Sequence, residues 1–306
     1  MTYSIVARDP GTGELGVAVQ TRWFNVGSGV PWAEPGVGAV ATQSFTLESY
    51  GPLGLEAMRG GASAPDALAR LVAADAGREV RQVGMVDATG RSTAFTGADC
   101  VQAAGHRTGE DFSVQANMME RASVWPAMAA AFRSTEGDLA GRLLATLWAA
   151  EGEGGDVRGR QSAALLVVPG TGDPRATRFD LRVEDDRTPL EELTRLLEVA
   201  RAYEAFDRAE KMATEGDLTA AAGLMDQAHA LAPDDDMITL WTSVFIAGVG
   251  RIDDARELFA QASRVEPRSA EHLRRFVAAG QLPPAAQAII EMLAGPSTTG
   301  VRTPRS

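Results

Sequence analysis

The chain has 306 residues, of which 45% are hydrophobic and 23% are charged, and its formal net charge is −12. This length is typical of about two domains. The negative charge argues against binding of nucleic acid or an anionic membrane through clustered basic side chains, and the single cysteine, Cys100, rules out an intrachain disulfide. Because no segment is as apolar as a membrane span and residues 1–9 lack the features of a signal peptide, we expect a soluble, cytoplasmic protein.

Strand and helix signals alternate in the first part of the chain. Apolar strands are predicted over residues 2–9 and 14–21, with the turn signal Asp-Pro-Gly-Thr-Gly between them. Further strands are predicted over residues 36–45, 81–87, 91–96, 112–118 and 161–168, and helices over 50–58, 64–74, 124–133 and 137–151. Ser63 is a candidate cap for the second helix. Short turns between consecutive strands favour an antiparallel sheet, and paired helices suggest outer layers.

After residue 187 the sequence has no strand signal and instead repeats with a period of 34 residues. The matching pairs are Gly216 and Gly250, Leu218 and Ile252, Ala221 and Ala255, Met225 and Phe259, Ala228 and Ala262, and Pro233 and Pro267. This is the period and pattern of tetratricopeptide repeats. We therefore expect an all-α helical-repeat domain over residues 187–306. It includes a shortened third helix pair at 269–279 and 283–293 and a disordered tail at 297–306.

Several motifs of the first part resemble the uncharacterised DUF1028 family. They are Ser-Ile-Val-Ala-Arg-Asp at 4–9, Gly-Val-Ala-Val at 16–19, Val-Ala-Thr-Gln at 40–43, Gly-His-Arg-Thr-Gly at 105–109, Phe-Ser-Val-Gln at 112–115 and Gly-Asp-Val-Arg-Gly-Arg-Gln-Ser at 155–162. The resemblance predicts a first domain over residues 1–186. Because that family is similar to N-terminal-nucleophile (Ntn) hydrolases, the implied fold class is α+β. It would be a four-layer αββα sandwich followed by the helical-repeat domain.

Thr2 follows Met1 directly and opens the first predicted strand. If Met1 is removed, the α-amine and the hydroxyl of Thr2 lie together, and an α-amine can act as the base for its own hydroxyl nucleophile. The reference pKa of an α-amine is about 7.7–8.0, so a useful fraction is neutral near pH 7. The alternative is that Thr2 is only a good strand former.

The resemblance to Ntn hydrolases implies two further catalytic residues, Asn117 near the nucleophile and Asp156 before the last central strand. The chain also departs from that pattern. Lys211, in the repeat region, is the only lysine, so none is available as a neighbour of Thr2. Arg22 lies where an aspartate is expected; it can offer positive charge to a substrate but cannot shuttle protons.

Other candidate substrate-binding residues lie in three segments. Arg158, Arg160 and Ser162 belong to a polar loop before a buried strand, and the arginines could bind a carboxylate bidentately; the alternative is a solvated turn with an internal Asp–Arg bridge. Backbone donors near Gln43 and Ser44, or near residues 115–117, could hold an oxyanion. His106, predicted in a loop, could place a titrating side chain at a cleft or bond to nearby backbone.

Two functions from different classes remain open. The first is an amide hydrolase acting on a small amide or peptide-like substrate, with Thr2 as nucleophile. The second is a non-catalytic scaffold on an Ntn-like fold that binds a peptide or protein through its repeats. No metal site and no cofactor are predicted, and we expect a homo-oligomer. Trp23, Phe24 and Trp32 are candidates either for a pocket or for core and dimer contacts.

Overall fold

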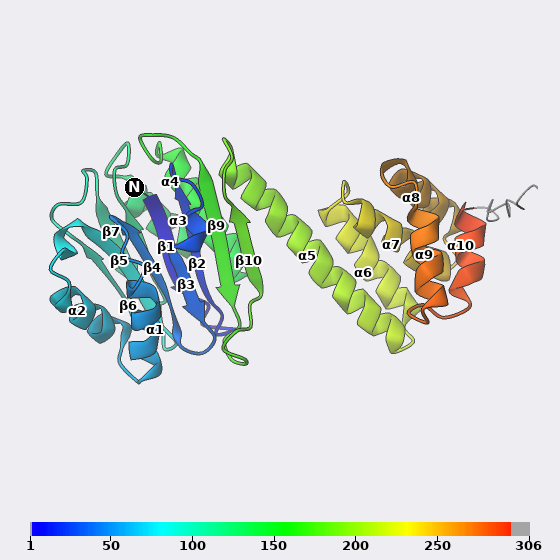
Figure 1. The fold of residues 1–306 in the computed structure, drawn as a ribbon, viewed down its shortest axis with the longest axis horizontal. Helices are drawn as coiled ribbons and strands as arrows, with labels where there is room; N and C mark the ends of the chain where they lie inside the picture. Colours follow the sequence, from blue (N-terminus) through cyan, green and yellow to red (C-terminus); the bar gives the residue numbers. More distant parts are fainter. Residues whose placement is uncertain (1, 295–306) are drawn as a thin grey trace, which may run out of the picture. The chain divides into compact units, whose positions relative to one another are not determined.

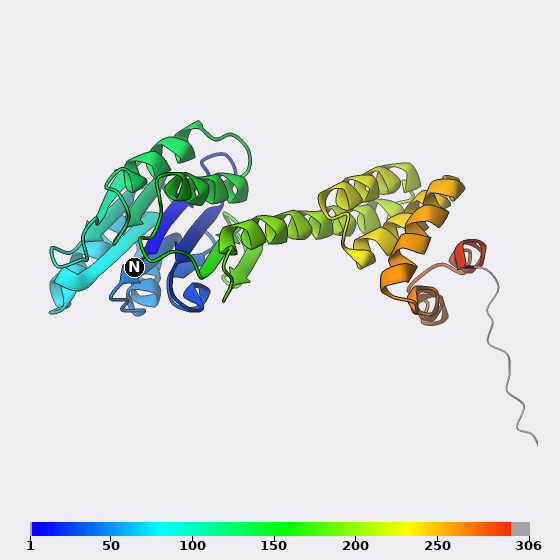
Figure 2. The same cartoon turned by 90° about the horizontal axis from the view of Figure 1, so that it is seen from above.

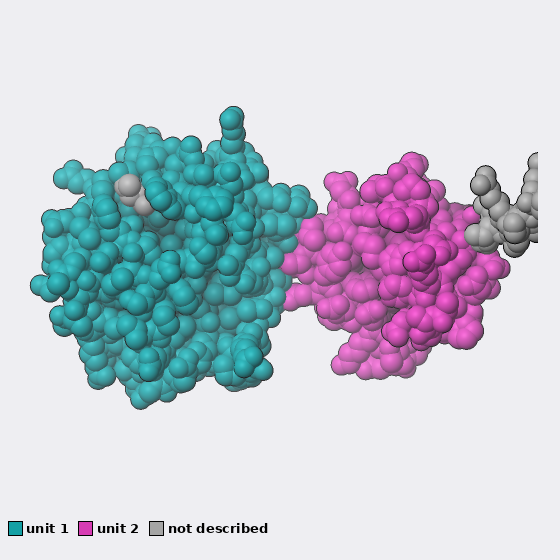
Figure 3. Space-filling view, in the orientation of Figure 1, with its two compact units in different colours: residues 1–197 teal, residues 198–306 magenta. Residues whose placement is uncertain are grey.

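The computed structural model describes residues 2–294. The chain divides into two compact units, residues 1–197 and 198–306, which Figure 3 colours separately. The division falls within helix α5 (Pro189–Thr214). Residues 297–306, expected to be a disordered tail, lie outside the described part of the chain.

The first unit contains two antiparallel sheets (Figure 1). The larger sheet has the order β10-β9-β2-β1-β8-β7 and the smaller one the order β3-β4-β5-β6. Their strands are β1 (Thr2–Arg8), β2 (Leu15–Thr21), β3 (Pro31–Glu34), β4 (Gly38–Ser44), β5 (Arg81–Asp87), β6 (Ser92–Thr96), β7 (Gly105–Gly109), β8 (Phe112–Ala116), β9 (Ser162–Val168) and β10 (Phe179–Val183). Every pairing between these strands is antiparallel, as the short turns predicted.

Helix pairs cover the outer faces of the two sheets, which pack against each other (Figure 2). Helices α3 (Val124–Ser134) and α4 (Leu139–Gly152) lie on the larger sheet, and α1 (Tyr50–Arg59) and α2 (Ala64–Ala74) lie on the smaller one. Buried apolar side chains such as Val6, Val17 and Ala39 fill the space between the sheets. The α+β class expected for this part of the chain is confirmed.

Local sequence accounts for several boundaries. The Ser63 hydroxyl accepts a hydrogen bond from the Asp66 backbone N–H at 3.1 Å, so the predicted cap of α2 is confirmed. Asp138 caps α4 in the same way through the Gly141 N–H at 3.0 Å. Along β1, alternate side chains point to opposite faces: Ser4 bonds to Gln43 of the smaller sheet, and Tyr3 bonds to Glu151 of α4. Thr2 therefore faces the space between the sheets.

Three strands differ from the sequence-based expectation. His106 lies within strand β7 and not in a loop, and β3 and β10 were not predicted as strands. All three are edge strands of their sheets. An edge strand pairs on one side only and can carry polar residues, Gly or an initial Pro, so segments such as Gly-His-Arg-Thr-Gly lack the apolar alternation that marks an inner strand.

The second unit is helical, and no strand is assigned in its described residues. Its helices after α5 are α6 (Leu218–Leu231), α7 (Asp236–Gly248), α8 (Ile252–Val265), α9 (Ser269–Ala278) and α10 (Ala286–Ala294). Helices α6 and α8 have 14 residues each and follow glycines with left-handed backbone, Gly216 at φ 91° and Gly250 at φ 86°. Their equivalent side chains Ala221 and Ala255 are both fully buried. Within residues 2–294, no helix has the length and apolarity needed to cross a membrane.

Candidate active site

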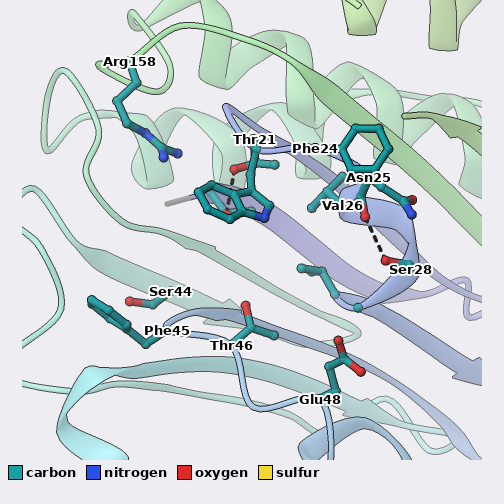
Figure 4. A pocket seen from close by; sticks show the side chains of 14 residues that line it. Thr21, Phe24, Asn25, Val26, Ser28, Ser44, Phe45, Thr46, Glu48 and Arg158 are labelled. Atoms are coloured by element: carbon teal, nitrogen blue, oxygen red, sulfur yellow. Dashed lines mark hydrogen bonds between the residues drawn. The ribbon is translucent and has the colours of Figure 1, made fainter. Parts of the chain in front are cut away.

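A pocket of about 410 Å³ opens where β1 begins and where β2 and β4 end (Figure 4). One wall is the loop after β2, including the short 3-10 turn Val26–Ser28, and the other is the loop after β4. Of the residues predicted to form the site, Thr2 and Arg158 line this pocket. The topology thus brings the start of the first strand and the loop before β9 to a common hollow.

The hydroxyl, the backbone N–H and the carbonyl oxygen of Thr2 all form hydrogen bonds. Its hydroxyl donates to Thr21 Oγ1 at 3.1 Å, and its backbone N–H donates to the Asn117 carbonyl at 3.3 Å. Its own carbonyl oxygen accepts three hydrogen bonds, from Asn117 N at 3.1 Å, Asn117 Nδ2 at 3.3 Å and Gln43 Nε2 at 3.2 Å. Thr2 is only 4% exposed. The main chain of Thr2 therefore has a fixed position at the pocket, and the bond to Thr21 orients its hydroxyl.

Gln82 is the centre of the polar network beneath Thr2, and no sequence motif pointed to it. Its side-chain oxygen accepts from Gln43 Nε2 and Asn117 Nδ2, both at 2.8 Å, and its Nε2 donates to Thr96 Oγ1 and the Ala116 carbonyl, both at 2.9 Å. Gln43, Gln82 and Asn117 are completely buried. The hydrogen bonds among these buried amides make a rigid connection between the sheets.

His106 lies at the far end of the same network. Its Nδ1 is 2.8 Å from Thr96 Oγ1, and Thr96 is bonded in turn to Gln82. Burial, and to a smaller extent the charge of Arg107, lower the pKa of His106. The imidazole lines a separate hollow of about 600 Å³ with Cys100 and Trp125. It is therefore connected to Thr2 through hydrogen bonds but does not line the Thr2 pocket.

Asp156 holds the loop that carries Arg158. Its carboxylate accepts from Arg158 Nε at 3.1 Å and Nη2 at 2.7 Å, and from the backbone N–H groups of Arg158 at 2.9 Å and Arg22 at 3.2 Å. The Asp156 side chain is fully buried and that of Arg158 is 25% exposed. The internal Asp–Arg bridge considered for this loop is thus present, and it positions Arg158 at the pocket. A carboxylate with four donors is suited to holding a loop.

The other candidate substrate-binding residues lie away from the pocket surface. Gln43 and Ser162 are completely buried, and Ser162 Oγ donates to the Trp23 carbonyl at 2.5 Å and accepts from Val26 N at 3.1 Å. Arg160 pairs with Glu151 at 3.4 Å and Glu191 at 3.1 Å. The side chain of Arg22 donates to Gln161 Oε1 at 2.6 Å. In this structure Gln43 and Ser162 support the walls of the site and do not touch its contents.

Sequence reasoning missed most of the pocket wall. Trp23 and Phe24, considered as pocket residues, do line it, but Phe45 and Glu48 of the opposite loop were not identified. Trp32 packs instead in the apolar cluster beneath α1 and α2. Two wall residues have left-handed backbone although neither is glycine: Asn25 at φ 53° and Ser44 at φ 71°. Such conformations are costly and concentrate at functional sites; the only sequence signal for them is the tolerance of Asn for this region.

Comparison with known proteins identifies the family. Residues 2–193 match the model of DUF1028, which is described as a family of unknown function. The chain belongs to the DUF1028 family. The whole pocket, from Thr2 to Arg158, lies inside the DUF1028 region. No curated protein matches the chain.

A solved structure of the same family is similar to this DUF1028 protein. It is the crystal structure of protein SPO2555 from Silicibacter pomeroyi, which is 33% identical. The similarity covers 64% of this chain and 87% of that one, with a TM-score of 0.59. The covered part of this chain corresponds in length to the first unit.

Proposed function

We propose that this DUF1028 protein is an amide hydrolase in which Thr2, made N-terminal by removal of Met1, is the nucleophile. One observation carries the proposal: Thr2 lines a pocket while hydrogen bonds from both sheets fix its main chain. Catalysis by a positioned group requires this kind of preorganisation. The two main-chain bonds between Thr2 and Asn117 continue the pairing of β1 with β8, whereas the bonds from the side-chain amides of Gln43 and Asn117 exceed what the start of a strand requires.

The layered fold is a second argument. Two antiparallel sheets pack face to face, and a helix pair covers each outer face. This agrees with the four-layer αββα arrangement that the resemblance to Ntn hydrolases implies. In such a fold the nucleophile opens a central strand, and Thr2 opens β1, an inner strand of the larger sheet.

The chemistry then follows from the groups at Thr2. The hydroxyl oxygen attacks the carbonyl carbon of a small amide, and the neutral α-amine takes the hydroxyl proton. The tetrahedral intermediate collapses when the amine passes that proton to the leaving nitrogen, and the C–N bond breaks. Water then hydrolyses the resulting ester of Thr2, releasing the acid and restoring the hydroxyl.

Asn117 is suited to orient the α-amine. The Thr2 backbone nitrogen already donates to the Asn117 carbonyl at 3.3 Å. The Asn117 side-chain oxygen is buried and has no hydrogen-bond partner among the residues that the structure describes. A buried acceptor without a partner is unfavourable, and the protons of a free α-amine would supply one. In this proposal Asn117 replaces the orienting role of the lysine that the chain lacks near Thr2.

The oxyanion requires donors that are not already engaged. The Asn117 N–H already donates to the Thr2 carbonyl, and the Phe45 N–H donates to the Val80 carbonyl at 3.2 Å. These two N–H groups are therefore not available to stabilise an oxyanion. Trp23, Phe24 and Thr46 also line the pocket, and within residues 2–294 their backbone N–H groups have no protein acceptor. We assign the oxyanion donors to these loops.

The test combines mass and activity. Intact-mass measurement of the purified protein should show loss of Met1, because Thr is a small second residue that processing enzymes accept. A panel of small amides is then screened with the parent and with Thr2→Ala. Hydrolysis by the parent and its loss in the variant are expected. A retained Met1, or equal activity of the two proteins, would disprove the mechanism.

The second candidate function is a non-catalytic scaffold. It is favoured by the absence of a lysine near Thr2 and by exposed aromatic side chains on the helical unit, where Tyr203 is 40% and Phe276 is 37% exposed. Matching helices α6 and α8 agree with a tetratricopeptide-like repeat that binds a peptide or protein. Retained Met1 together with an amide screen that finds no turnover would favour this function.

A further inference from the structure

Exposed aromatic side chains gather around the Thr2 pocket. Trp23 is 70% exposed, Phe24 is 59% exposed and Phe45 is 58% exposed, and all three line the hollow. Trp23 and Phe24 come from the loop after β2, and Phe45 comes from the loop after β4. Large apolar side chains left in solvent at a concave site are typical of a surface that a ligand covers. The pocket is therefore built to take an apolar group.

The charges of the pocket are not balanced. Glu48 and Arg158 are the charged side chains that line it. The positive charge of Arg158 is opposed by the buried carboxylate of Asp156, to which it donates two side-chain hydrogen bonds. Glu48, in contrast, has no ion pair and no side-chain hydrogen bond with any residue of the described part, 2–294. An unpaired negative charge therefore remains in the hollow.

The Glu48 carboxylate lies between the two loops that form the pocket walls. It belongs to the loop after β4, and a Cβ built on Gly29 of the opposite loop would lie 3.1 Å from its Oε1. In Figure 4 its side chain points towards the hollow, at the opposite side of the group from Arg158. A ligand that packs against the aromatic side chains of the pocket can therefore reach the Glu48 carboxylate.

We infer that the pocket selects a cationic ligand: a small amide that carries a protonated amine next to an apolar or aromatic group. The ammonium would bind Glu48, and the apolar part would lie against Trp23, Phe24 and Phe45. Aromatic faces attract cations as well as apolar groups, so both parts of the wall favour the same ligand. The inference names the substrate class of the proposed hydrolase and in that respect rests on it.

Two other partners for Glu48 must be considered. The first is the α-ammonium of Thr2, but that amine has to be neutral to act as the base, so it leaves Glu48 unpaired in the active form. The second is the N-terminus of α1, since Glu48 directly precedes the capping position Ser49 and a carboxylate there is favourable. In that case Glu48 would affect the stability of the protein and not its choice of ligand.

The test measures binding with three probes of similar shape and different charge. Phenethylamine is cationic, 3-phenylpropionamide is neutral and 3-phenylpropionate is anionic at pH 7. Their dissociation constants are measured by calorimetry on the parent protein, on Glu48→Gln and on the control Glu56→Gln, which changes an exposed glutamate of α1 outside the pocket. We expect the amine to bind about fivefold more tightly than the neutral amide to the parent, since Glu48 is exposed.

Glu48→Gln should abolish that preference and leave the affinity for the neutral amide unchanged, whereas Glu56→Gln should bind like the parent. No charge preference in the parent, tighter binding of the anion, no detectable binding of the amine, or an unchanged preference in Glu48→Gln would each overturn the inference. The outcome is separable from the proposed function. Amine binding without any Thr2-dependent hydrolysis disproves the hydrolase alone, and Thr2-dependent hydrolysis with no charge preference disproves this inference alone.

Discussion

The carbonyl oxygen of Thr2 accepts a hydrogen bond from the side-chain amide of Gln43, 3.2 Å away on the opposite sheet. Gln43 lies on β4 of the smaller sheet, and Thr2 begins β1 of the larger one. The bond is completely buried, where a hydrogen bond is strong and a missing partner is costly. Thr2 is therefore positioned by a side chain 41 residues later in the chain.

Replacing the hydroxyl of Thr2 separates catalysis from stability. Thr2→Ala removes the hydroxyl bonded to Thr21 together with a buried methyl group and should cost about 1–2 kcal/mol of unfolding free energy. Hydrolysis of a substrate found by screening should fall by orders of magnitude. Thr2→Ser keeps the hydroxyl and the amine and should retain part of the activity. Steady-state kinetics and urea unfolding measure the two effects, and an active Thr2→Ala protein would contradict the assignment.

Gln82 should be essential to the stability of the first unit although it does not line the pocket. Gln82→Leu removes an acceptor from the side-chain amides of Gln43 and Asn117. It also removes the donor to the Thr96 hydroxyl and the Ala116 carbonyl. We expect a loss of about 2–4 kcal/mol. Urea unfolding followed by tryptophan fluorescence reports on this unit, because four of the five tryptophans lie in it. The control Gln102→Leu, at an exposed position, should change the unfolding free energy little. An equal loss of unfolding free energy in both variants would show that the buried network does not stabilise the protein.

The chain offers an internal control for the buried Asp156–Arg158 pair. Asp180 and Arg182 have the same spacing and the same bidentate bonds, at 2.8 and 3.0 Å, but are about 40% exposed. Asp156→Asn should cost about 2–4 kcal/mol, because it weakens a buried pair and its bonds to two backbone N–H groups. Asp180→Asn should cost under about 0.5 kcal/mol. Urea unfolding measures the loss of unfolding free energy in both variants. Similar losses would mean that burial of the Asp156–Arg158 pair does not increase its contribution to stability.

His106 should make the first unit less stable in mild acid. Burial lowers the pKa of His106 in the folded protein, so as pH falls the unfolded chain takes up the proton first. The stability that this group contributes is present above the unfolded pKa of about 6.5 and is lost as pH falls through the lower, folded pKa. The parent should therefore lose more unfolding free energy between pH 8 and pH 5 than His106→Gln does. A steeper loss in the variant would contradict the sign.

Local sequence determined the elements that depend on near neighbours. The hairpin of β1 and β2 follows from two apolar runs around Asp-Pro-Gly-Thr-Gly, and Asp9 does bind the N–H groups of Gly11 and Thr12 at 2.8 and 2.9 Å. The start of α2 follows from Ser63 and its bond three residues on. The pattern of small and apolar residues after residue 187 likewise predicted a helical region. In each case the interacting groups lie within a few residues, so the pattern itself contains the contact.

Tertiary structure alone decided how the candidate site is assembled. Thr2 could be singled out from the sequence because it follows Met1, but its partners Gln43, Gln82 and Asn117 come from different parts of the chain and meet through strand pairing and sheet packing. The same packing sets the loop of Phe45 and Glu48 against the loop after β2. The apolar pattern of a strand predicts which of its faces is buried, but it does not predict which strand of the other sheet packs against that face. Gln43 and Asn117 could be named as candidates from the sequence, but Gln82 and the hydrogen bonds that join all three to Thr2 depend on how the two sheets pack together.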